Sequence, residues 1–159
     1  MTRWEKFFQW LDGILIQLFP YDVNPATLPM NQEPTPTPAP TSLLTTFFAA
    51  IRQYEGANPA NNNPYDFRYY AGGYLPKYGT VRESSGGFAM FGTLALGEFY
   101  GETCIKEMIH NHPKWTFYDF FNRFAPSSDN NNPTAYADWV AQRCGLPATT
   151  VLSTGLKVA

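Results

Sequence analysis

The chain has few cysteines, few histidines and few charged residues, and each shortage excludes a class of protein. Cys104 and Cys144 are too few for a disulfide scaffold in a chain of 159 residues. Neither belongs to a C-x-x-C pair and His110 and His112 lack a ligand pattern, so no metal site is predicted. The chain contains 11 Lys and Arg and 13 Asp and Glu, and this balance excludes a nucleic-acid binder that depends on a basic field. No apolar run approaches the roughly 20 residues of a membrane span.

The N-terminal residues 1–19 carry the pattern of an amphipathic helix. Their apolar side chains recur at the spacing of one helix face. They are Trp4, Phe7, Phe8, Leu11, Ile14, Leu15 and Leu18. Polar residues interrupt the stretch and no A-x-A site follows, so we predict no secretory signal. We expect the apolar face to pack on the domain or on another chain, or else to lie on a membrane surface.

Residues 20–40 are rich in proline and predict an extended, rather stiff linker. Pro34, Pro36, Pro38 and Pro40 alternate with Thr and Ala, a composition that favours a spacer. The remaining residues, 41–159, form the predicted domain. A hydrophobic fraction of 44% in the whole chain is enough for one globular core.

The domain is predicted to be mainly α. Capping residues and glycines bound four helices, at about 42–55, 93–109, 116–125 and 132–144. Residues 57–87 are rich in Gly, Asn, Pro and Tyr, and predict a long loop with a short hairpin between the first two of these helices. Gly97 and Gly101 lie one turn apart, where we expect a neighbouring backbone to approach closely.

Glu55 is the residue whose position is unusual. It lies four residues after Ile51 and eight after Phe47, so it shares the helix face that should be buried. It also stands at the helix end, just before Gly56, where the exposed carbonyls carry partial negative charge. Both features raise the pKa of a carboxyl and favour a general acid. The alternative is that Glu55 is the hydrated end of an amphipathic helix.

Four segments in order resemble a family of phage and prophage peptidoglycan-cleaving domains, the lysozyme-like lytic transglycosylases. They are AIRQYEG (50–56), NNNP (61–64) with Arg68, GFAMFGTLALG (87–97) and FAPSSDNNNPTAYADWV (124–140). The resemblance covers roughly residues 44–153. Where the family has Gly-Asn-Leu after NNP, this chain has Tyr65, Asp66 and Phe67. The change from Gly to Tyr65 removes a permissive backbone position from the loop.

The resemblance implies a lysozyme-like fold in which Glu55 is the catalytic acid and base, with no cofactor. Glu55 would protonate the β-1,4 glycosidic oxygen between N-acetylmuramic acid and N-acetylglucosamine, and the muramyl 6-hydroxyl would then close a 1,6-anhydro ring. In a hydrolase water attacks instead, usually with the help of a second carboxylate. Asp66 and Glu83 are the loop carboxylates that could have this role. Their alternatives are a turn residue for Asp66 and a surface charge for Glu83.

Four further residues are predicted to bind substrate: Asn63, Phe88, Phe91 and Tyr136. Tyr136 faces inward on the last long helix and places its hydroxyl near the cleft, or packs in the core. Asn63 holds substrate or caps its own turn. Phe88 and Phe91 lie where the family presents main chain to the sugar, although core packing also accounts for their rings. Cys104 and Cys144 are expected to be buried thiols, unless their Cα atoms lie close enough to pair.

The resemblance also implies where the protein acts and what it contacts. We expect a virion component that reaches the bacterial cell wall or periplasm, with a peptidoglycan glycan strand as substrate. Residues 1–19 would contact a virion protein, and interfacial membrane contact is the alternative. The competing function is a non-catalytic virion structural protein with a glycan-binding or relic domain. A catalytic Glu55 should line an open groove, whereas Tyr65 should cover it in a relic.

Overall fold

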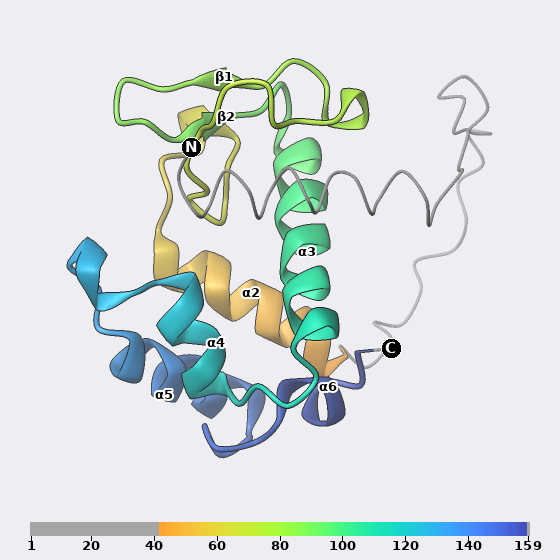
Figure 1. Ribbon diagram of the computed structural model, residues 1–159, viewed down its shortest axis with the longest axis vertical. Coiled ribbons are helices and arrows are strands. Elements are labelled where there is room, and N and C mark those ends of the chain that lie inside the picture. The colour runs from red at the N-terminus through yellow and green to blue at the C-terminus, as the bar shows by residue number, and fades with distance from the viewer. Residues whose placement is uncertain (1–41, 159) are drawn as a thin grey trace, which may run out of the picture. The chain divides into compact units, whose positions relative to one another are not determined.

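Residues 42–158 form a mainly helical domain in the computed structural model, which describes this part of the chain (Figure 1). The helix predicted for residues 1–19 and the linker predicted for 20–40 lie outside the described residues. The α-helices are α2 (Leu43–Glu55), α3 (Leu94–Asn111), α4 (Phe117–Phe124), α5 (Pro133–Cys144) and α6 (Leu152–Gly155). The 3-10 helices are η1 (Pro59–Asn61), η2 (Pro76–Tyr78) and η3 (Ser127–Asp129), and the strands are β1 (Arg82–Glu83) and β2 (Ala89–Met90).

Helix α2 begins and ends where its capping residues predict. The Ser42 hydroxyl accepts a hydrogen bond from the Thr45 N–H at 3.1 Å. Gly56 ends the helix in the left-handed conformation, at φ 55°. Thr93 caps α3 in the same way as Ser42 caps α2, and α3 extends to Asn111, two residues beyond the predicted end. Capping residues close in the sequence therefore determine where the two helices that flank the long loop meet that loop.

The two later helices also follow their sequence signals. Thr116 and Asp119 form the predicted capping box at the start of α4, each side chain bonding the other residue's N–H. Asn132 caps α5, whose first residue is a proline, and Gly145 ends it in the left-handed conformation. The predicted boundaries of α4 and α5 are confirmed to within a residue or two.

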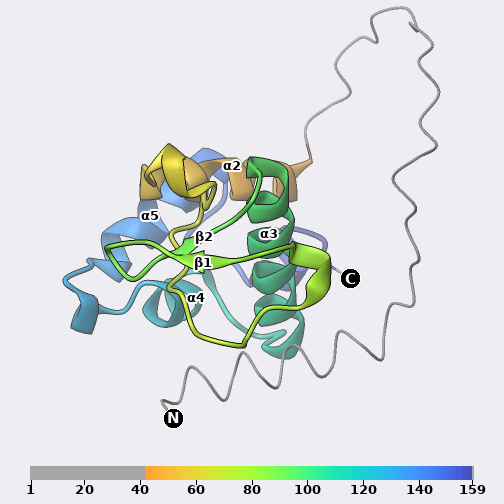
Figure 2. The same cartoon turned by 90° about the horizontal axis from the view of Figure 1, so that it is seen from above.

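The long loop contains the predicted hairpin. Strands β1 and β2 pair antiparallel, with Arg82 opposite Met90 and Glu83 opposite Ala89. The segment 67–69 runs antiparallel along the other edge of β2, because the Ala89 N–H donates to the Phe67 carbonyl at 2.9 Å. Seen from above, the hairpin lies beside α3, and the segment that leads into β1 crosses this helix (Figure 2). The loop is therefore a small ordered layer above the helices.

The core lies where α2 meets α4 and α5. Phe47 is completely buried, and its ring meets those of Phe117 and Phe120 edge-on, each at 5.7 Å between centroids. Helix α5 packs against both α2 and α4. Figure 1 shows α2 between this pair and α3. The C-terminal end of α2, which carries Glu55, thus faces α5 on one side and leads into the loop on the other.

Two glycines on α3 let the loop lie directly against the helix. A Cβ at Gly97 would stand 1.8 Å from the carbonyl oxygen of Asn62, so the predicted close approach of a backbone is confirmed there. At Gly101 the neighbour is a side chain, since a Cβ would stand 2.0 Å from the ring of Tyr65. Neither position admits a larger residue without displacing the loop.

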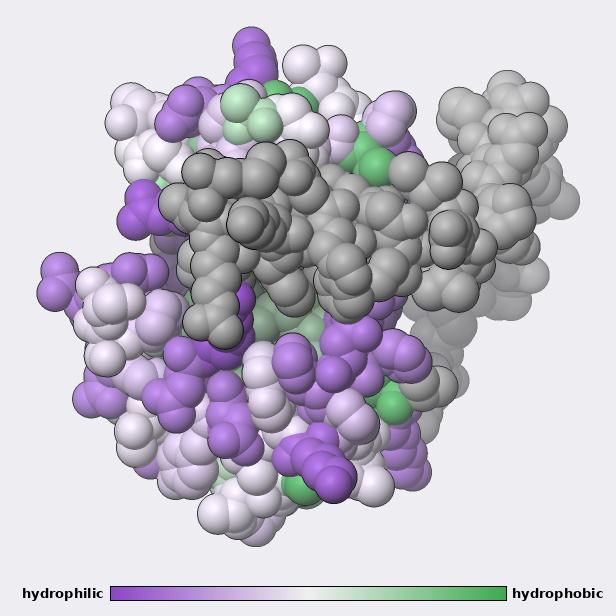
Figure 3. All heavy atoms as spheres, viewed as in Figure 1, coloured by the Kyte–Doolittle hydropathy of each residue, from purple (hydrophilic) through white to green (hydrophobic). Residues whose placement is uncertain are grey.

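Large hydrophobic side chains are exposed at few places among residues 42–158. Leu94 and Phe99 on α3 are about half exposed, and Leu43 and Tyr54 on α2 somewhat less. The face drawn in Figure 3 shows hydrophobic residues as small separate patches among hydrophilic ones. Within the described part of the chain, no helix has the length and apolar character needed to cross a bilayer.

Candidate functional site

Glu55 shares a short hydrogen bond with Tyr136. Glu55 is the last residue of α2 and is partly buried, while Tyr136 on α5 is 2% exposed. The Tyr136 hydroxyl lies 2.7 Å from Oε1 of Glu55, and 3.4 Å from the carbonyl oxygen of Ile51. The hydroxyl donates to the carboxylate when Glu55 is ionised. The sequence leaves open whether Tyr136 packs in the core or has a hydroxyl near the cleft; in the structure its ring is buried and its hydroxyl bonds Glu55.

Burial raises the pKa of Glu55 from its usual 4.5 to about 7. The hydrogen bond from Tyr136 opposes this rise, because it stabilises the carboxylate, and the negative charge of Asp66 adds to it. Burial, one of the two causes predicted from the sequence, is the largest of these contributions. Near neutral pH a substantial fraction of Glu55 therefore carries its proton, as a general acid requires.

Two aromatic rings hold Tyr136 in place. Tyr54 stacks on it at 3.7 Å between centroids and Phe121 stacks on it at 4.1 Å. Burial raises the pKa of Tyr136, and the nearby Glu55 raises it further, so the hydroxyl stays neutral and remains a donor. A fixed, neutral donor beside a carboxyl keeps that carboxyl in one position.

Asn63 is directed into the loop and not toward solvent. It is 1% exposed, and its amide nitrogen donates to the carbonyls of Phe67 at 2.9 Å and Ala89 at 3.1 Å. Its amide oxygen accepts from the Phe67 N–H at 3.2 Å. Both donor hydrogens are thus used within the protein. These bonds fit the alternative that the sequence leaves open for Asn63, in which it holds its own turn.

The other two asparagines of the run differ from each other. Asn62 adopts the left-handed conformation, at φ 49°, and its amide donates to the Phe91 carbonyl at 3.1 Å. Asn61 is 7% exposed, and within residues 42–158 its side-chain amide has no hydrogen-bond partner. A side-chain amide without a partner inside the protein pairs with water or a ligand. Of the three amides in the run 61–63, that of Asn61 is therefore available to a ligand, and a run of three identical residues gave no signal to select it.

Phe88 and Phe91 have different environments. Phe91 is 4% exposed, and its ring packs 5.2 Å from that of Tyr100, so core packing accounts for it. Its N–H is used as well, since it donates to the Asn61 carbonyl at 2.9 Å. Phe88 is partly exposed, and the guanidinium of Arg68 covers its ring at 4.4 Å. Of the two predicted substrate contacts, Phe88 alone keeps an accessible surface.

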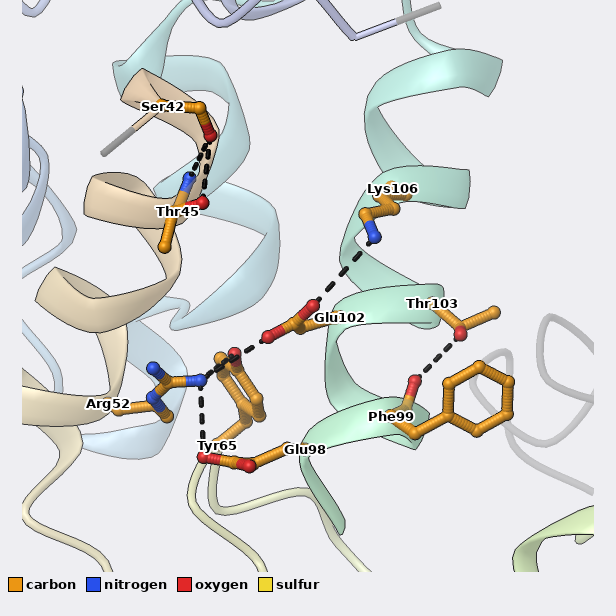
Figure 4. Close-up of polar contacts among 9 residues, drawn as sticks. All are labelled: Ser42, Thr45, Arg52, Tyr65, Glu98, Phe99, Glu102, Thr103 and Lys106. Atoms are coloured by element: carbon orange, nitrogen blue, oxygen red, sulfur yellow. Dashed lines mark hydrogen bonds and ion pairs between the residues drawn. The ribbon is translucent and has the colours of Figure 1, made fainter. Parts of the chain in front are cut away.

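Tyr65, the main departure from the family pattern, packs against α3. Its ring is 2% exposed and lies over Gly101, and its hydroxyl accepts a hydrogen bond from Nη1 of Arg52 at 3.3 Å (Figure 4). Tyr65 also has no left-handed backbone, whereas the following Asp66 does, at φ 52°. The loop thus accommodates the large side chain by burying it against α3.

The two loop carboxylates lie in unlike surroundings. Glu83 is exposed on β1, whereas Asp66 is partly buried. Burial raises the pKa of Asp66, and Arg68 opposes the rise. Cys104 and Cys144 are both buried, and they do not form a disulfide with each other. Among residues 42–158, no three His, Cys, Asp or Glu side chains lie together in a way that could hold a metal ion.

Comparison of the chain with protein-family models, with curated proteins and with solved structures finds no match.

Proposed function

We propose that residues 42–158 form a lysozyme-like domain that cleaves the β-1,4 bond between N-acetylmuramic acid and N-acetylglucosamine in peptidoglycan. The observation that carries the proposal is the Glu55–Tyr136 pair: a partly buried carboxyl with a pKa of about 7, held at 2.7 Å by a neutral donor. The four sequence segments that resemble phage lytic transglycosylases supply the substrate class. On the same grounds we place the protein on a virion, attached through residues 1–19 and acting at the cell wall.

The pair accounts for both halves of an acid–base reaction. Protonated Glu55 gives its proton to the glycosidic oxygen, and the bond from that oxygen to the muramyl C1 breaks, with its electron pair moving to the oxygen. The acetamido oxygen of the substrate stabilises the positive charge that develops at C1. Tyr136 stabilises the carboxylate that Glu55 has become, because it donates a hydrogen bond to that anion.

The second half returns the proton to Glu55. The carboxylate accepts a proton from the muramyl 6-hydroxyl, whose oxygen attacks C1 and closes a 1,6-anhydro ring. Glu55 is then protonated again and ready for another cycle. This route needs one carboxyl only, and Asn61 offers an amide for a hydroxyl or acetamido group of the sugar.

Hydrolysis is the second candidate reaction, and the position of Asp66 is what favours it. A second carboxylate would activate water in place of the 6-hydroxyl. Asp66 is the carboxylate whose charge reaches Glu55, whereas Glu83 lies exposed on β1. The two reactions differ in product, since hydrolysis leaves a reducing end and transglycosylation leaves an anhydro ring.

The test is mass spectrometry of muropeptides released from purified peptidoglycan by the full chain. Wild type should release anhydro-muropeptides, and Glu55→Gln, which keeps the size but removes the acid, should lose release by a factor of about 10² or more. Glu107→Gln, a partly buried glutamate on α3, is the matched control and should keep wild-type activity.

Three other outcomes decide between the alternatives. Reducing ends in place of anhydro products would identify a hydrolase. Equal release by wild type and Glu55→Gln would remove Glu55 from the mechanism. If wild type releases nothing from walls that a control enzyme cleaves, the domain is the non-catalytic virion protein that the sequence leaves as the alternative.

A further inference from the structure

We propose that Arg143 of α5 binds a carboxylate of the peptide stem that muramic acid carries in peptidoglycan, on a surface next to Glu55. The inference rests on the proposed function, because it assumes a peptidoglycan strand at Glu55. It also goes beyond that function, since it predicts that the domain distinguishes strands that carry peptide stems from bare glycan. The contact can be measured without turnover.

The guanidinium of Arg143 is held over the ring of Trp139. Its Cζ lies 3.0 Å from the ring centroid, and Trp139 stands about one turn earlier on α5. Nη1 donates to the Trp139 carbonyl at 3.4 Å, and Nε donates to Oε1 of Gln53 on α2 at 3.3 Å. A guanidinium fixed in this way loses little conformational freedom when it binds a ligand.

Arg143 is exposed, and its charge has no counter-ion among residues 42–158. The ion pairs of this part of the chain join α2 to α3 or lie within α3, and none includes Arg143. The two hydrogen bonds of its guanidinium go to uncharged oxygens, and Nη2 has no acceptor within the described residues. The remaining N–H groups can therefore bind a carboxylate, whose two oxygens match the guanidinium fork.

Tyr54 joins this arginine to the site of Glu55. The ring of Tyr54 stacks on that of Tyr136 at 3.7 Å and meets that of Trp139 edge-on at 5.2 Å between centroids. The first of these rings belongs to the residue that bonds Glu55, and the second supports the guanidinium of Arg143. Tyr54 is 39% exposed, so it offers an apolar surface between the acid and the guanidinium.

The spacing suits a peptide that begins at the muramyl ring. Tyr136 and Arg143 are about two turns apart on α5, which is about 10 Å along the helix axis. An extended peptide advances about 3.5 Å per residue, so the first two or three residues of the stem span this distance. The second residue of the stem is an acidic one, and its carboxylate falls within this range. The small apolar residue before it would lie along Tyr54.

The test measures binding in the full chain with Glu55→Gln, which prevents turnover. The probe is a soluble disaccharide muropeptide, and the comparison compounds are the same muropeptide with its carboxyl groups amidated and the disaccharide without peptide. Each is titrated while the indole N–H of Trp139 is followed by NMR. We expect the muropeptide to bind more tightly than either comparison compound by a factor of about 10 or more, as charge-assisted hydrogen bonds contribute.

Replacing the guanidinium should remove this preference. Arg143→Gln, in the same Glu55→Gln chain, should bind all three compounds with similar affinity. Lys114→Gln removes a positive charge from an exposed turn between α3 and α4, so it is the matched control and should keep the preference. The comparison of the three compounds needs no Arg143 variant, so it decides the question even where that substitution affects folding.

Tighter binding of the muropeptide, lost in Arg143→Gln and kept in Lys114→Gln, supports the inference. Equal affinity for the three compounds, no binding at all, or a preference that persists in folded Arg143→Gln overturns it. Tighter binding of a glycerol phosphate oligomer also overturns it, because the site would then recognise phosphate. If the preference is found but wild type cleaves no peptidoglycan, the contact with the stem stands and the proposed function fails.

Discussion

The raised pKa of Glu55 predicts that Glu55→Gln stabilises the protein at neutral and alkaline pH. A carboxyl whose pKa is higher in the folded state favours folding only while it is protonated. Its contribution is fully present below the unfolded pKa of 4.5, and it is lost as the pH rises through the folded value of about 7. Glutamine has no charge to bury, so it avoids this loss while it can still accept the hydrogen bond from Tyr136.

The size of the effect follows from the two pKa values. The pKa of Glu55 rises from 4.5 to about 7 on folding. At about 1.4 kcal/mol per pKa unit, wild type loses about 3 kcal/mol of unfolding free energy as the pH rises through this range. Against a total stability of about 5–15 kcal/mol for a domain, this is a large fraction. In thermal unfolding it amounts to roughly 10 °C in Tm for a domain of this size.

Urea unfolding of wild type and Glu55→Gln, at several values between about pH 4 and about pH 8, measures the prediction. The other carboxyls are common to both proteins, so the difference in unfolding free energy isolates Glu55. We expect the unfolding free energy of Glu55→Gln, relative to that of wild type, to increase by about 3 kcal/mol from the lowest to the highest pH. A difference that stays constant over the whole range would refute the argument that Glu55 is buried enough to hold a proton.

Three further predictions concern the surroundings of Glu55. Tyr136→Phe removes the donor that lowers the pKa of Glu55, so NMR titration should give a value above about 7, and an unchanged value would contradict the pairing. Asn63→Ala leaves buried main-chain groups unpaired and should lower the unfolding free energy by about 2–4 kcal/mol in urea titrations, whereas a loss under about 0.5 kcal/mol would contradict its role in the loop. Gly101→Ala should cost about 1–3 kcal/mol in the same assay, because its Cβ would overlap the ring of Tyr65, and a neutral effect would show that the ring does not lie there.

The sequence alone predicted the helical frame and the candidate acid. Helix ends depend on residues a few positions apart, such as Ser42 and Gly56 for α2, so their signals are complete within the local sequence. The helical period placed Glu55 on the face of Phe47 and Ile51, both of which are fully buried. Because these effects act over one or two turns, no knowledge of the tertiary structure was needed for them.

Only the tertiary structure decided what surrounds Glu55. The bond to Tyr136 joins residues 81 positions apart, and a periodic pattern says which face of a helix is buried but not what lies against it. The loop carries no period at all, so nothing local distinguishes Asn61 from Asn63, or predicts that Tyr65 turns toward α3. Which of these polar groups stays available for a ligand depends on hydrogen bonds across the fold, and those exist only once the loop is packed against the helices.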